Sequence, residues 1–419
     1  MTDQPAGVRT IAIVDAYSSA RNLAPSFRAR GYECVHVRSS AVTNPTYGRS
    51  FRPGDFVSDI MHGGDVEATV AALRRHAPSC VIPGIESGVA MADVLSEALA
   101  LRTNGTDLSS ARRNKYRMME VVRAAGIPAA KQILVDDLDT LQDWYAEMGC
   151  RVVLKPLESA GNDGVHFCRN VDEVRAAFGA LLGSSSALGT QNRSVLAQEY
   201  LVGAEYLINA VSLDGRHHIT DIWKMHHMAA NGVSDLGAGA NLLRRRGVEQ
   251  DALVDHTLLV LDALGIRNGP THSEVKLTPR GPRLIETASR MCGADLHVPV
   301  RTATGESQVE WTVDAYVDPD RFLARWKDDY VLIKHAGLVN MVSPAAGTLR
   351  GYPKMDELEA LDSFLEVALA TRPGEQVHRT IDDWTYPMRV YLAHDTESIL
   401  VHDLTTARYL DGEGFYDIA

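Results

Sequence analysis

The sequence predicts a multidomain protein that combines an α/β domain with α+β domains. The length of 419 residues suits two to four domains, and the composition, 45% hydrophobic and 23% charged, is that of an ordinary globular protein. Over the first hundred residues, short β-branched runs alternate with stretches of helical periodicity. Long disorder, a fibrous repeat and a single small binding module are therefore excluded.

The first hundred residues are predicted to form an open parallel sheet whose strands are connected by helices. We expect strands at 10–14, 33–37 and 80–82 and helices at 20–30 and 66–76. Pro83 and Gly84 stop the third strand, so the segment PGIESG at 83–88 lies at its carboxyl end, where open parallel sheets bind their ligands. Glu86 can face such a ligand, or it can serve as the N-terminal acid of a helix.

Two compact α+β units and a strand-rich region are predicted next. A basic amphipathic helix at 109–125 is closed by Gly126, with Pro128 beyond it, as is typical of a helix end. The pattern then predicts helices at 171–182 and 251–264 and strands at 151–154, 195–197, 205–213, 218–223, 271–277 and 283–287. Beyond about residue 330 the chain is rich in strands and turns. We therefore expect four domains, at 1–106, 107–192, 193–325 and 326–419.

The charge balance argues against nucleic acid and membrane surfaces as partners. The 42 basic and 54 acidic side chains give a net charge of −12, which repels polyphosphate backbones and anionic lipid heads. There is no apolar run of about 18 residues, and MTDQPAGVRT lacks the pattern of a signal peptide, so we expect a cytoplasmic protein. The five cysteines are scattered without C-x-x-C spacing, so we expect small buried residues and neither disulfides nor a zinc site.

Two lysines stand in contexts that suit phosphate binding. The motifs G-x-x-x-x-G-K-[ST], G-x-G-x-x-G, H-E-x-x-H and G-x-S-x-G are missing, so a nucleotide would need another architecture. Lys115 begins a predicted helix and Lys155 ends a predicted strand, where an ammonium group can hold phosphate oxygens, although a lone lysine is more often a solvated surface residue. The loop at 158–165 contains glycines and can fold its backbone N–H groups over an anion, although a plain hairpin loop would look similar.

Two carboxylates indicate a divalent metal. Glu274 and Glu286 lie in adjacent predicted strands of one hairpin, among apolar neighbours, so they can project side by side from a buried sheet. A cation relieves the repulsion between such carboxylates, and oxygen-only ligation favours Mg²⁺ or Mn²⁺ over zinc. The alternative is ion pairing with Lys276 or Arg290. Arg290 also offers a bidentate fork for an anionic group.

The histidines give a weaker signal. Adjacent residues on a strand point to opposite faces, so neither the pair at 217–218 nor His226 with His227 is expected to share a metal ion. The second pair begins a glycine-rich stretch that could line a substrate pocket. His272 is two residues before Glu274 and is expected on the same face, which makes it the histidine nearest to the chemistry.

Four segments, in this order and at these separations, resemble the signature of the ATP-grasp carboxylate-amine ligases. They are NKYRMMEVVRAAGIP, VVLKPLESAGNDGV, QEYLVGAEYLINAVS and the pair Glu274 and Glu286 with Arg290. Within this superfamily the chain is most similar to the L-amino acid ligases, which join two free amino acids into a dipeptide. The resemblance is clear over about 80–310. It implies an ATP-grasp fold across 107–325, with a Rossmann-like domain before it and a C-terminal β-rich domain after it.

The resemblance also implies roles for the matching residues. Lys115 and Lys155 match the lysines that hold the nucleotide phosphates, under a mobile loop that includes Ser159, Gly161 and Gly164. Main-chain hydrogen bonds to adenine would come from the hinge at Glu199, Tyr200 and Leu201, and Glu205 would hold the ribose hydroxyls. The metal would bind Glu274 and Glu286. The expected catalytic residues are Arg290, His272 and Lys155, and the expected substrate residues are Glu86, His226, His227 and Gly293.

One departure from the family pattern bears on the metal. Many relatives have asparagine two residues after the second metal acid, where this chain has Ala288. The metal shell must therefore be completed by ATP oxygens, by water or by a bidentate Glu286.

The resemblance implies an ATP-dependent ligase that couples two amino acids through an acyl phosphate and releases ADP and phosphate. ATP and Mg²⁺, or Mn²⁺, are the expected cofactors. The expected partners are two amino-acid substrates, and neither nucleic acid nor a membrane is expected. A homodimer is compatible with these expectations. The product is a free dipeptide or a step toward an antibiotic. One alternative is a ligase or carboxylase of the same superfamily that uses formate or bicarbonate. Another is a nucleotide-binding regulatory module without turnover.

Overall fold

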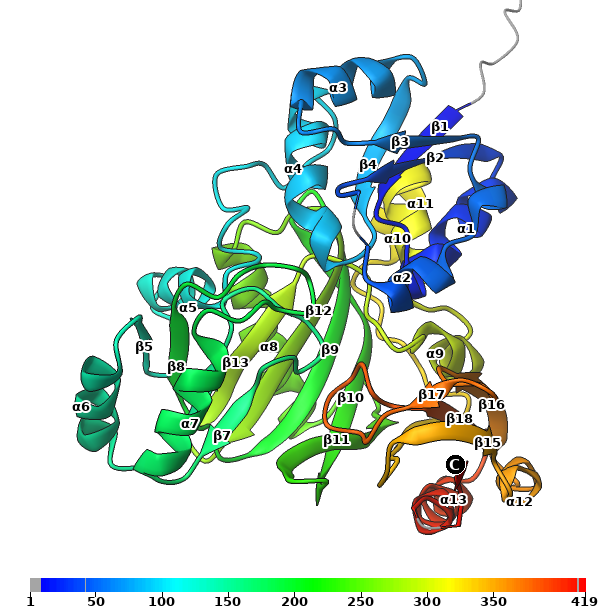
Figure 1. Cartoon of the computed structure of the whole chain (residues 1–419). Coiled ribbons are helices and arrows are strands. Elements are labelled where there is room, and N and C mark those ends of the chain that lie inside the picture. Colours follow the sequence, from blue (N-terminus) through cyan, green and yellow to red (C-terminus); the bar gives the residue numbers. More distant parts are fainter. Residues whose placement is uncertain (1–8, 42, 413) are drawn as a thin grey trace, which may run out of the picture.

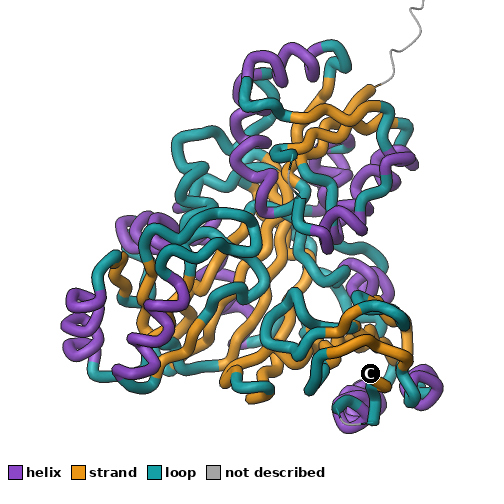
Figure 2. The backbone as a smooth tube through the Cα atoms, in the orientation of Figure 1, coloured by secondary structure: helices purple, strands orange, loops and turns teal. Residues whose placement is uncertain are grey.

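The computed structural model describes residues 9–41, 43–412 and 414–419, and its four sheets carry helices on their faces (Figures 1 and 2). Residues 1–8, which make up most of the stretch in which we expect no signal peptide, lie outside the described residues. Among the described residues, no helix combines the length and hydrophobicity needed to cross a bilayer.

The N-terminal domain contains a four-stranded parallel sheet of order β3-β2-β1-β4, which confirms the predicted α/β class of this region. Its strands are β1 (Arg9–Val14), β2 (Tyr32–Arg38), β3 (Ser58–Met61) and β4 (Pro78–Pro83). Its helices are α1 (Leu23–Ala29), α2 (Pro45–Ser50), α3 (Val66–Arg74) and α4 (Val89–Ala98), with short 3₁₀ turns η1 (Ser18–Asn22), η2 (Pro53–Asp55) and η3 (Glu86–Gly88). The single helix predicted at 20–30 is therefore η1 followed by α1.

A smaller four-stranded sheet of order β5-β8-β6-β7 forms the lobe on the left of Figure 1. It consists of β5 (Gln132–Val135), β6 (Val152–Lys155), β7 (His166–Cys168) and β8 (Val195–Glu199), and helices α6 (Leu138–Met148) and α7 (Val171–Leu181) pack against it. The preceding helix α5 (Lys115–Ala124) starts later than the predicted 109–125, because the side chain of Asn114 caps it by accepting a hydrogen bond from the Arg117 N–H at 3.0 Å.

An eight-stranded antiparallel sheet of order β13-β12-β9-β10-β11-β14-β18-β16 forms the centre of the molecule. Its strands are β9 (Ala204–Leu213), β10 (Arg216–Ala230), β11 (Val233–Leu242), β12 (Gly269–Thr278), β13 (Gly281–Ala288), β14 (His335–Met341), β16 (Phe364–Leu369) and β18 (Met388–His394). The sheet continues without a break across position 326, where we expect a domain boundary.

The remaining elements cover this sheet and extend it. Helices α8 (Val248–Ala263), α9 (His297–Thr304), α10 (Gln308–Val317) and α11 (Pro319–Arg325) lie between its strands in sequence, and α10 also packs against α1 of the N-terminal domain. At the C-terminal end are α12 (Met355–Glu359), α13 (Glu397–Leu410) and a small sheet of β15 (Gly347–Gly351), β17 (Gln376–Val377) and β19 (Asp417–Ile418).

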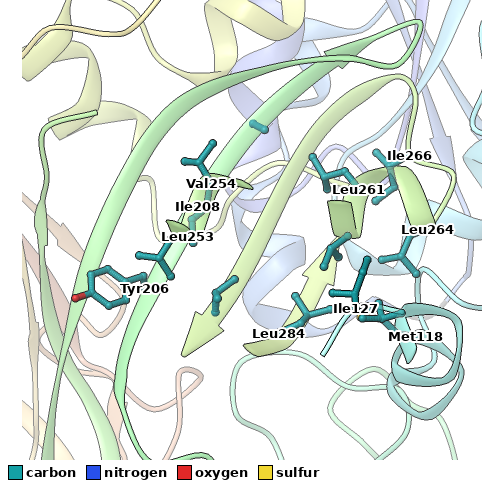
Figure 3. Close-up of a cluster of buried hydrophobic side chains, with 14 of the residues drawn as sticks. Met118, Ile127, Tyr206, Ile208, Leu253, Val254, Leu261, Leu264, Ile266 and Leu284 are labelled. Atoms are coloured by element: carbon teal, nitrogen blue, oxygen red, sulfur yellow. The ribbon is translucent and has the colours of Figure 1, made fainter. Parts of the chain in front are cut away.

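The largest apolar cluster fixes the strands β9, β12 and β13 against helices α5 and α8 (Figure 3). Met118 of α5 and Leu261 of α8 are fully buried there, and so are Ile208 and Leu284 of the sheet. Full burial of such side chains contributes about 1.5–3 kcal/mol each. The ends of β12 and β13 are thereby held rigidly beside the first turn of α5.

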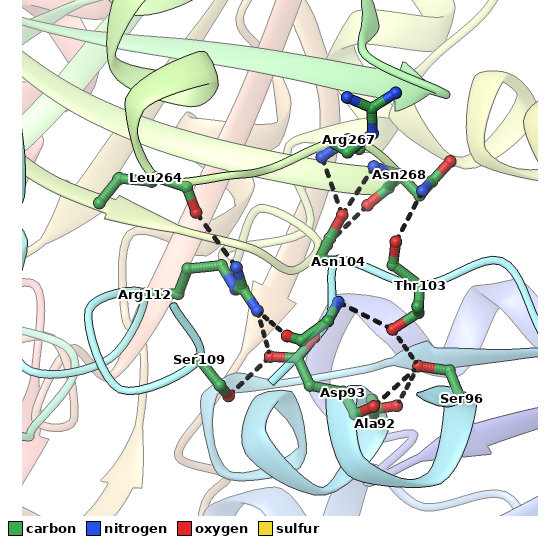
Figure 4. Close-up of polar contacts among 11 residues, drawn as sticks. Ala92, Asp93, Ser96, Thr103, Asn104, Ser109, Arg112, Leu264, Arg267 and Asn268 are labelled. Carbon is green, nitrogen blue, oxygen red and sulfur yellow. Dashed lines mark hydrogen bonds and ion pairs between the residues drawn. The ribbon is translucent and has the colours of Figure 1, made fainter. Parts of the chain in front are cut away.

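A buried polar network joins the N-terminal domain to the central sheet (Figure 4). The guanidinium of Arg112 is fully buried and donates to Asp93 Oδ2 at 2.9 Å and to the Leu264 carbonyl at 3.1 Å. Asn104 accepts from the main-chain N–H groups of Arg267 and Asn268, both at 2.8 Å. Directional bonds of this kind set the orientation of the N-terminal sheet relative to the strands that carry the site described next.

Candidate active site

Two adjoining cavities lie where the N-terminal sheet, the small sheet and the central sheet come together. The first lies between the small sheet and the end of the central sheet, and the second lies between the N-terminal domain, the central sheet and the loop before β18. They share the wall residues Ala160, Gly161, Asn162, Glu205, His227, Glu274 and Asp383. The two cavities are therefore immediate neighbours.

Lys155 and Lys115 lie together at the first cavity, although they come from different elements. Lys155 ends β6 and Lys115 begins α5, and their side chains are only 5% and 4% exposed. Lys115 Nζ donates to the Ser159 carbonyl at 3.0 Å and lies 3.1 Å from Glu286 Oε1. Lys155 has no ion-pair or hydrogen-bond partner among the residues that the structure describes. Burial and the charge of Lys115 lower the pKa of Lys155 to about 8.

The loop between β6 and β7 covers this cavity. Gly161, Asn162 and Gly164 have φ angles of 68°, 58° and 67°, a left-handed conformation that glycine adopts without strain. The loop is closed by hydrogen bonds from Ser159 Oγ to the Asp163 carbonyl at 3.2 Å and from the Val165 N–H to the Asn162 carbonyl at 3.2 Å. Ser159, Gly161 and Asn162 line the cavity, whereas Gly164 packs against Pro156 and Leu181 outside it.

Glu274 and Glu286 are directly opposite each other on β12 and β13, and both line the first cavity. The alternative ion pairs do not form: Lys276 instead lies 3.7 Å from Glu205 and 3.4 Å from Asp235. Burial alone would raise the pKa of Glu274, but His272, with help from Lys115 and Arg290, holds that pKa below its ordinary value. Glu274 is therefore anionic, and it lies opposite a second carboxyl group in a cavity wall that suits a cation.

His272 and Arg290 flank Glu274 on the side of the second cavity. His272 Nε2 lies 3.4 Å from Glu274 Oε1, and its Nδ1 is 2.8 Å from Asn209 Oδ1. Burial opposes a charge on His272, yet its neighbours Cys292 and Glu274 raise its pKa, so both ring nitrogens are donors. Arg290 lies just after β13 and its Nε is 3.4 Å from Glu86 Oε2.

The other predicted substrate residues separate into two groups. Gly293 lines the second cavity, and His227 lines both and lies 3.1 Å from Asp235. His226 points away from both cavities and pairs with Asn241 at 2.6 Å on an exposed face, as the alternation of a strand dictates. Glu86 lines neither cavity and reaches the site only through its contact with Arg290.

Part of the first cavity has an apolar lining, which we call the apolar slot. It consists of Val153 and Phe167 of the small sheet and Leu284 and Ile285 of β13, and the segment 198–201 lines the same cavity. The N–H groups of Glu199 and Tyr200 donate to the carbonyls of Lys131 at 2.8 Å and Arg151 at 3.1 Å. Glu205 is buried beside Glu274, which raises its pKa to about 7 against the opposing charges of His227 and Lys276.

Sequence reasoning missed several residues of the cavities. They are Tyr47, Asp235, Asn340, Asp383, Trp384 and Arg389. Asp235 lies in the glycine-rich stretch that begins at the second histidine pair, but nothing in that stretch marks this residue. Those at 340–389 reach the site only because the C-terminal strands extend the central sheet. The expectation of small buried cysteines is also wrong at one position, because Cys150 is exposed, while Cys34, Cys80, Cys168 and Cys292 are buried and all five are free.

Comparisons with known proteins agree with this architecture. Residues 148–297 match the model of the ATP-grasp domain. Dapdiamide A synthase of Enterobacter agglomerans is 31% identical over 422 residues, which cover 97% of this chain and 96% of that protein. The L-amino acid ligase of Bacillus licheniformis superposes with a TM-score of 0.77 over 98% of this chain and 99% of its own, at 17% identity. The N5-carboxyaminoimidazole ribonucleotide synthetase of Thermotoga maritima superposes with a TM-score of 0.68 over 96% and 98%, at 13% identity.

Proposed function

The chain belongs to the ATP-grasp carboxylate-amine ligases, and from this premise we propose that it joins the carboxylate of one amino acid to the amine of another with ATP, releasing ADP and phosphate. One observation carries the proposal: Lys155 holds a buried, unpaired ammonium group beside the cavity that Glu274 and Glu286 line. A triphosphate with its metal would satisfy both sets of charges at once. The use of ATP and the five free thiols favour the cytoplasm as its location.

We assign the apolar slot to the adenine base. Val153, Phe167 and Leu284 supply its flat apolar walls. Since Glu199 and Tyr200 already use their N–H groups within the protein, we assign the main-chain donor of the hinge to Leu201. Glu205 is placed between this slot and the carboxylate pair and suits the ribose hydroxyls.

The donor set suits magnesium. Among the described residues, no three or more His, Cys, Asp or Glu side chains gather as a metal cage, and we assign Glu274 and Glu286, which face each other across the strands, as the protein ligands. Magnesium retains water and commonly binds through one or two carboxylates together with phosphate oxygens, which also compensates for Ala288. When bound, it would supply positive charge to the phosphate oxygens of the substrate.

Direct amide formation from a carboxylate would expel oxide, so the carboxylate must first be activated. In the proposed reaction, the carboxylate of the first amino acid attacks the γ-phosphorus of ATP, and the bond between that phosphorus and the β,γ-bridging oxygen breaks. Lys155, Lys115 and Arg290 neutralise the charge that develops on the transferring oxygens. The amine of the second amino acid then attacks the acyl carbon, and phosphate leaves. His272 carries its proton at neutral pH, so it orients Glu274 and is not the base that deprotonates the amine.

A matrix of amino-acid pairs, assayed for ADP release and for the mass of the product, tests the proposal. We expect ADP release that requires both amino acids, together with a product whose mass is that of the two amino acids less one water. ADP release with formate or bicarbonate would instead support a carboxylase or a formate ligase. Tight ATP binding without ADP release under every condition would support a regulatory module.

A further inference from the structure

The loop that covers the phosphate end of the site is bonded to a segment more than two hundred residues away. Trp384 Nε1 donates to the Ala160 carbonyl at 3.0 Å, and the Asp383 N–H donates to the Gly161 carbonyl at 3.1 Å. The Asn162 amide adds a bond to Asp383 Oδ1 at 3.4 Å. The middle of the glycine loop is thus attached to the C-terminal domain.

The segment that holds the loop is itself braced. Thr385 Oγ1 donates to Asp382 Oδ1 at 2.8 Å, the Trp384 N–H donates to the same carboxylate at 3.1 Å, and Arg389 donates to the Asp383 carbonyl at 3.2 Å. The ring of Trp384 packs edge-on against Tyr47 of the N-terminal domain at 5.1 Å between centroids. Three domains therefore meet at this one indole.

Gly161 fits this contact closely. A Cβ atom at position 161 would lie 3.0 Å from Trp384 Nε1 and 3.1 Å from Asp383 Cβ, which is closer than side chains normally approach. The glycine thus serves both the left-handed turn and the approach of the indole.

We propose that Trp384 and Asp383 are positioning residues that latch the glycine loop closed, so that the acyl phosphate meets the amine before it meets water. The proposal rests on the proposed function. When the loop is open, water attacks the acyl phosphate, and either the acyl–oxygen or the phosphorus–oxygen bond breaks. The free carboxylate and phosphate are then released without formation of an amide.

The number of phosphates released per amide formed tests the latch. The wild-type ratio should be close to one, and Trp384→Ala should raise it roughly fivefold or more, because hydrolysis then competes with the amine. Trp384→Phe keeps the ring against Tyr47 and should restore part of the coupling. Gly161→Ala changes the loop side of the same contact and should also raise this ratio. Two matched controls should leave it at one: Tyr409→Ala, an aromatic residue that is 85% exposed, and Gly179→Ala, where nothing lies near the added Cβ.

A second measurement does not depend on turnover. With ADP and Mg²⁺ present, hydrogen exchange of the amides at 158–165 should be faster in Trp384→Ala than in the wild-type protein, while α7 exchanges as before. Equal exchange of the loop together with an unchanged phosphate-to-amide ratio would overturn the latch. Absence of amide with every pair would instead overturn the proposed function, and the exchange measurement would still decide the latch.

A separate observation concerns the second cavity. Asn340 of β14 and Arg389 of β18 are directly paired across their strands and line this cavity together. Asn340 Nδ2 donates to the Gly237 carbonyl at 3.0 Å, but its Oδ1 is buried without a partner, and so is the Nε of Arg389. No carboxylate of the described residues forms an ion pair with Arg389. Two facing residues of the second cavity therefore keep one acceptor and one donor without a partner among the described residues.

We infer that this pair recognises a carboxamide on an amino-acid substrate. The carbonyl oxygen of a carboxamide accepts from the Arg389 guanidinium, while its NH₂ group donates to Asn340 Oδ1, so both unused groups are satisfied. A carboxylate satisfies only the arginine, and an apolar side chain satisfies neither. This inference names the substrate class within the proposed function, and Asn340, which among the described residues makes no contact with the latch, tests it separately from the latch.

Competition between amino acids of similar size that differ in the end of the side chain tests this subsite. Glutamine should exceed glutamate and methionine in kcat/KM by tenfold or more, because a polar site left unpaired rejects the analogue that lacks the group. Arg389→Met and Asn340→Leu should each bring the ratio of kcat/KM for glutamine to kcat/KM for methionine close to one. Preference for glutamate that vanishes in Arg389→Met would show that a carboxylate is recognised and would overturn the carboxamide. Unchanged selectivity in both variants would overturn the subsite itself.

Discussion

Single side chains of the site are defined by the charges around them. Lys155 is the clearest case, because its buried ammonium group forms no ion pair with the described residues, and burial disfavours its charge until an anion arrives. Its position at the end of β6 could be predicted from the sequence run VVLK. The surroundings of its ammonium group could not be predicted from the sequence, because the acids that face it come from strands more than a hundred residues later.

Lys155 should make nucleotide affinity fall as the pH rises. Burial and the charge of Lys115 lower its pKa to about 8, so the ammonium form is complete well below that pH and disappears above it. Since phosphate binding needs the ammonium form, the Kd for ADP should rise roughly tenfold or more between pH about 7 and pH about 9.5. Calorimetric titration at several pH values measures this change, and proton uptake on binding near pH 8 should accompany it.

The matched variant for this prediction is Lys155→Arg. Arginine stays charged over the whole range, so its nucleotide affinity should be nearly independent of pH. The assignment of Lys155 to the phosphates is wrong if the wild-type protein and the variant respond to pH in the same way.

Glu286 should be essential for turnover and dispensable for folding. Glu286→Gln removes a metal ligand and the ion pair with Lys115, and we expect kcat to fall roughly 10²- to 10³-fold. The thermal unfolding midpoint should move little, because the side chain lies at a cavity wall. Glu357→Gln, an exposed acid of α12, is the control and should leave both quantities unchanged. Full activity of Glu286→Gln would refute the metal assignment.

At the scale of elements, the helix cap of α5 links local structure to the site. Asn114 begins the helix in which the next residue is Lys115, and α7 begins with an equivalent cap at Asn170, which accepts from the Glu173 N–H at 2.9 Å. The two caps have the same chemistry, but only one precedes a residue of the site.

Asn114→Ala and Asn170→Ala should therefore have equal effects on stability and unequal effects on function. Each should lower the free energy of unfolding by about 1 kcal/mol, which is the usual cost of a lost cap. Only Asn114→Ala should also raise the KM for ATP, because the first turn of α5 then frays and Lys115 moves. Denaturant unfolding and steady-state kinetics measure the two effects, and an equal rise of KM in both variants would contradict the link.

The elements themselves could be predicted where their pattern is strong. The hairpin of β12 and β13, the helix α7 and the strands of the N-terminal sheet follow from alternation, helical periodicity and turn residues. The edge strand β3, with its sequence SDIM, was missed because it is half buried and lacks a β-branched run. β10 is longer than predicted because its second half, past Trp223, continues as an exposed ribbon with a bulge at His226 and His227.

The whole molecule depends on contacts that sequence order conceals. Arg112, Trp384 and Asn340 each join segments more than a hundred residues apart, and no local pattern marks them. The predicted fold class, family and ligase function are confirmed, whereas the walls of the substrate cavity required the three-dimensional arrangement.

Arg112 should be the most costly of these residues to remove. Arg112→Leu leaves the buried carboxylate of Asp93 without its counter-ion, so the free energy of unfolding should fall by about 3–5 kcal/mol. Scanning calorimetry should show the N-terminal domain melting first. Arg123→Leu breaks an exposed ion pair with Glu120 and should cost less than about 1 kcal/mol. Equal losses in the two variants would mean that the network does not hold the domains together.

The central sheet limits where the chain can be truncated. β11 gives its outer hydrogen bonds to β14, at Gly239, Ala240 and Asn241. If the chain were cut before β14, these backbone groups would form an open edge that pairs with any extended peptide, including another copy. A chain truncated before β14 should therefore aggregate through this edge, so the C-terminal strands protect the sheet as well as supplying cavity residues.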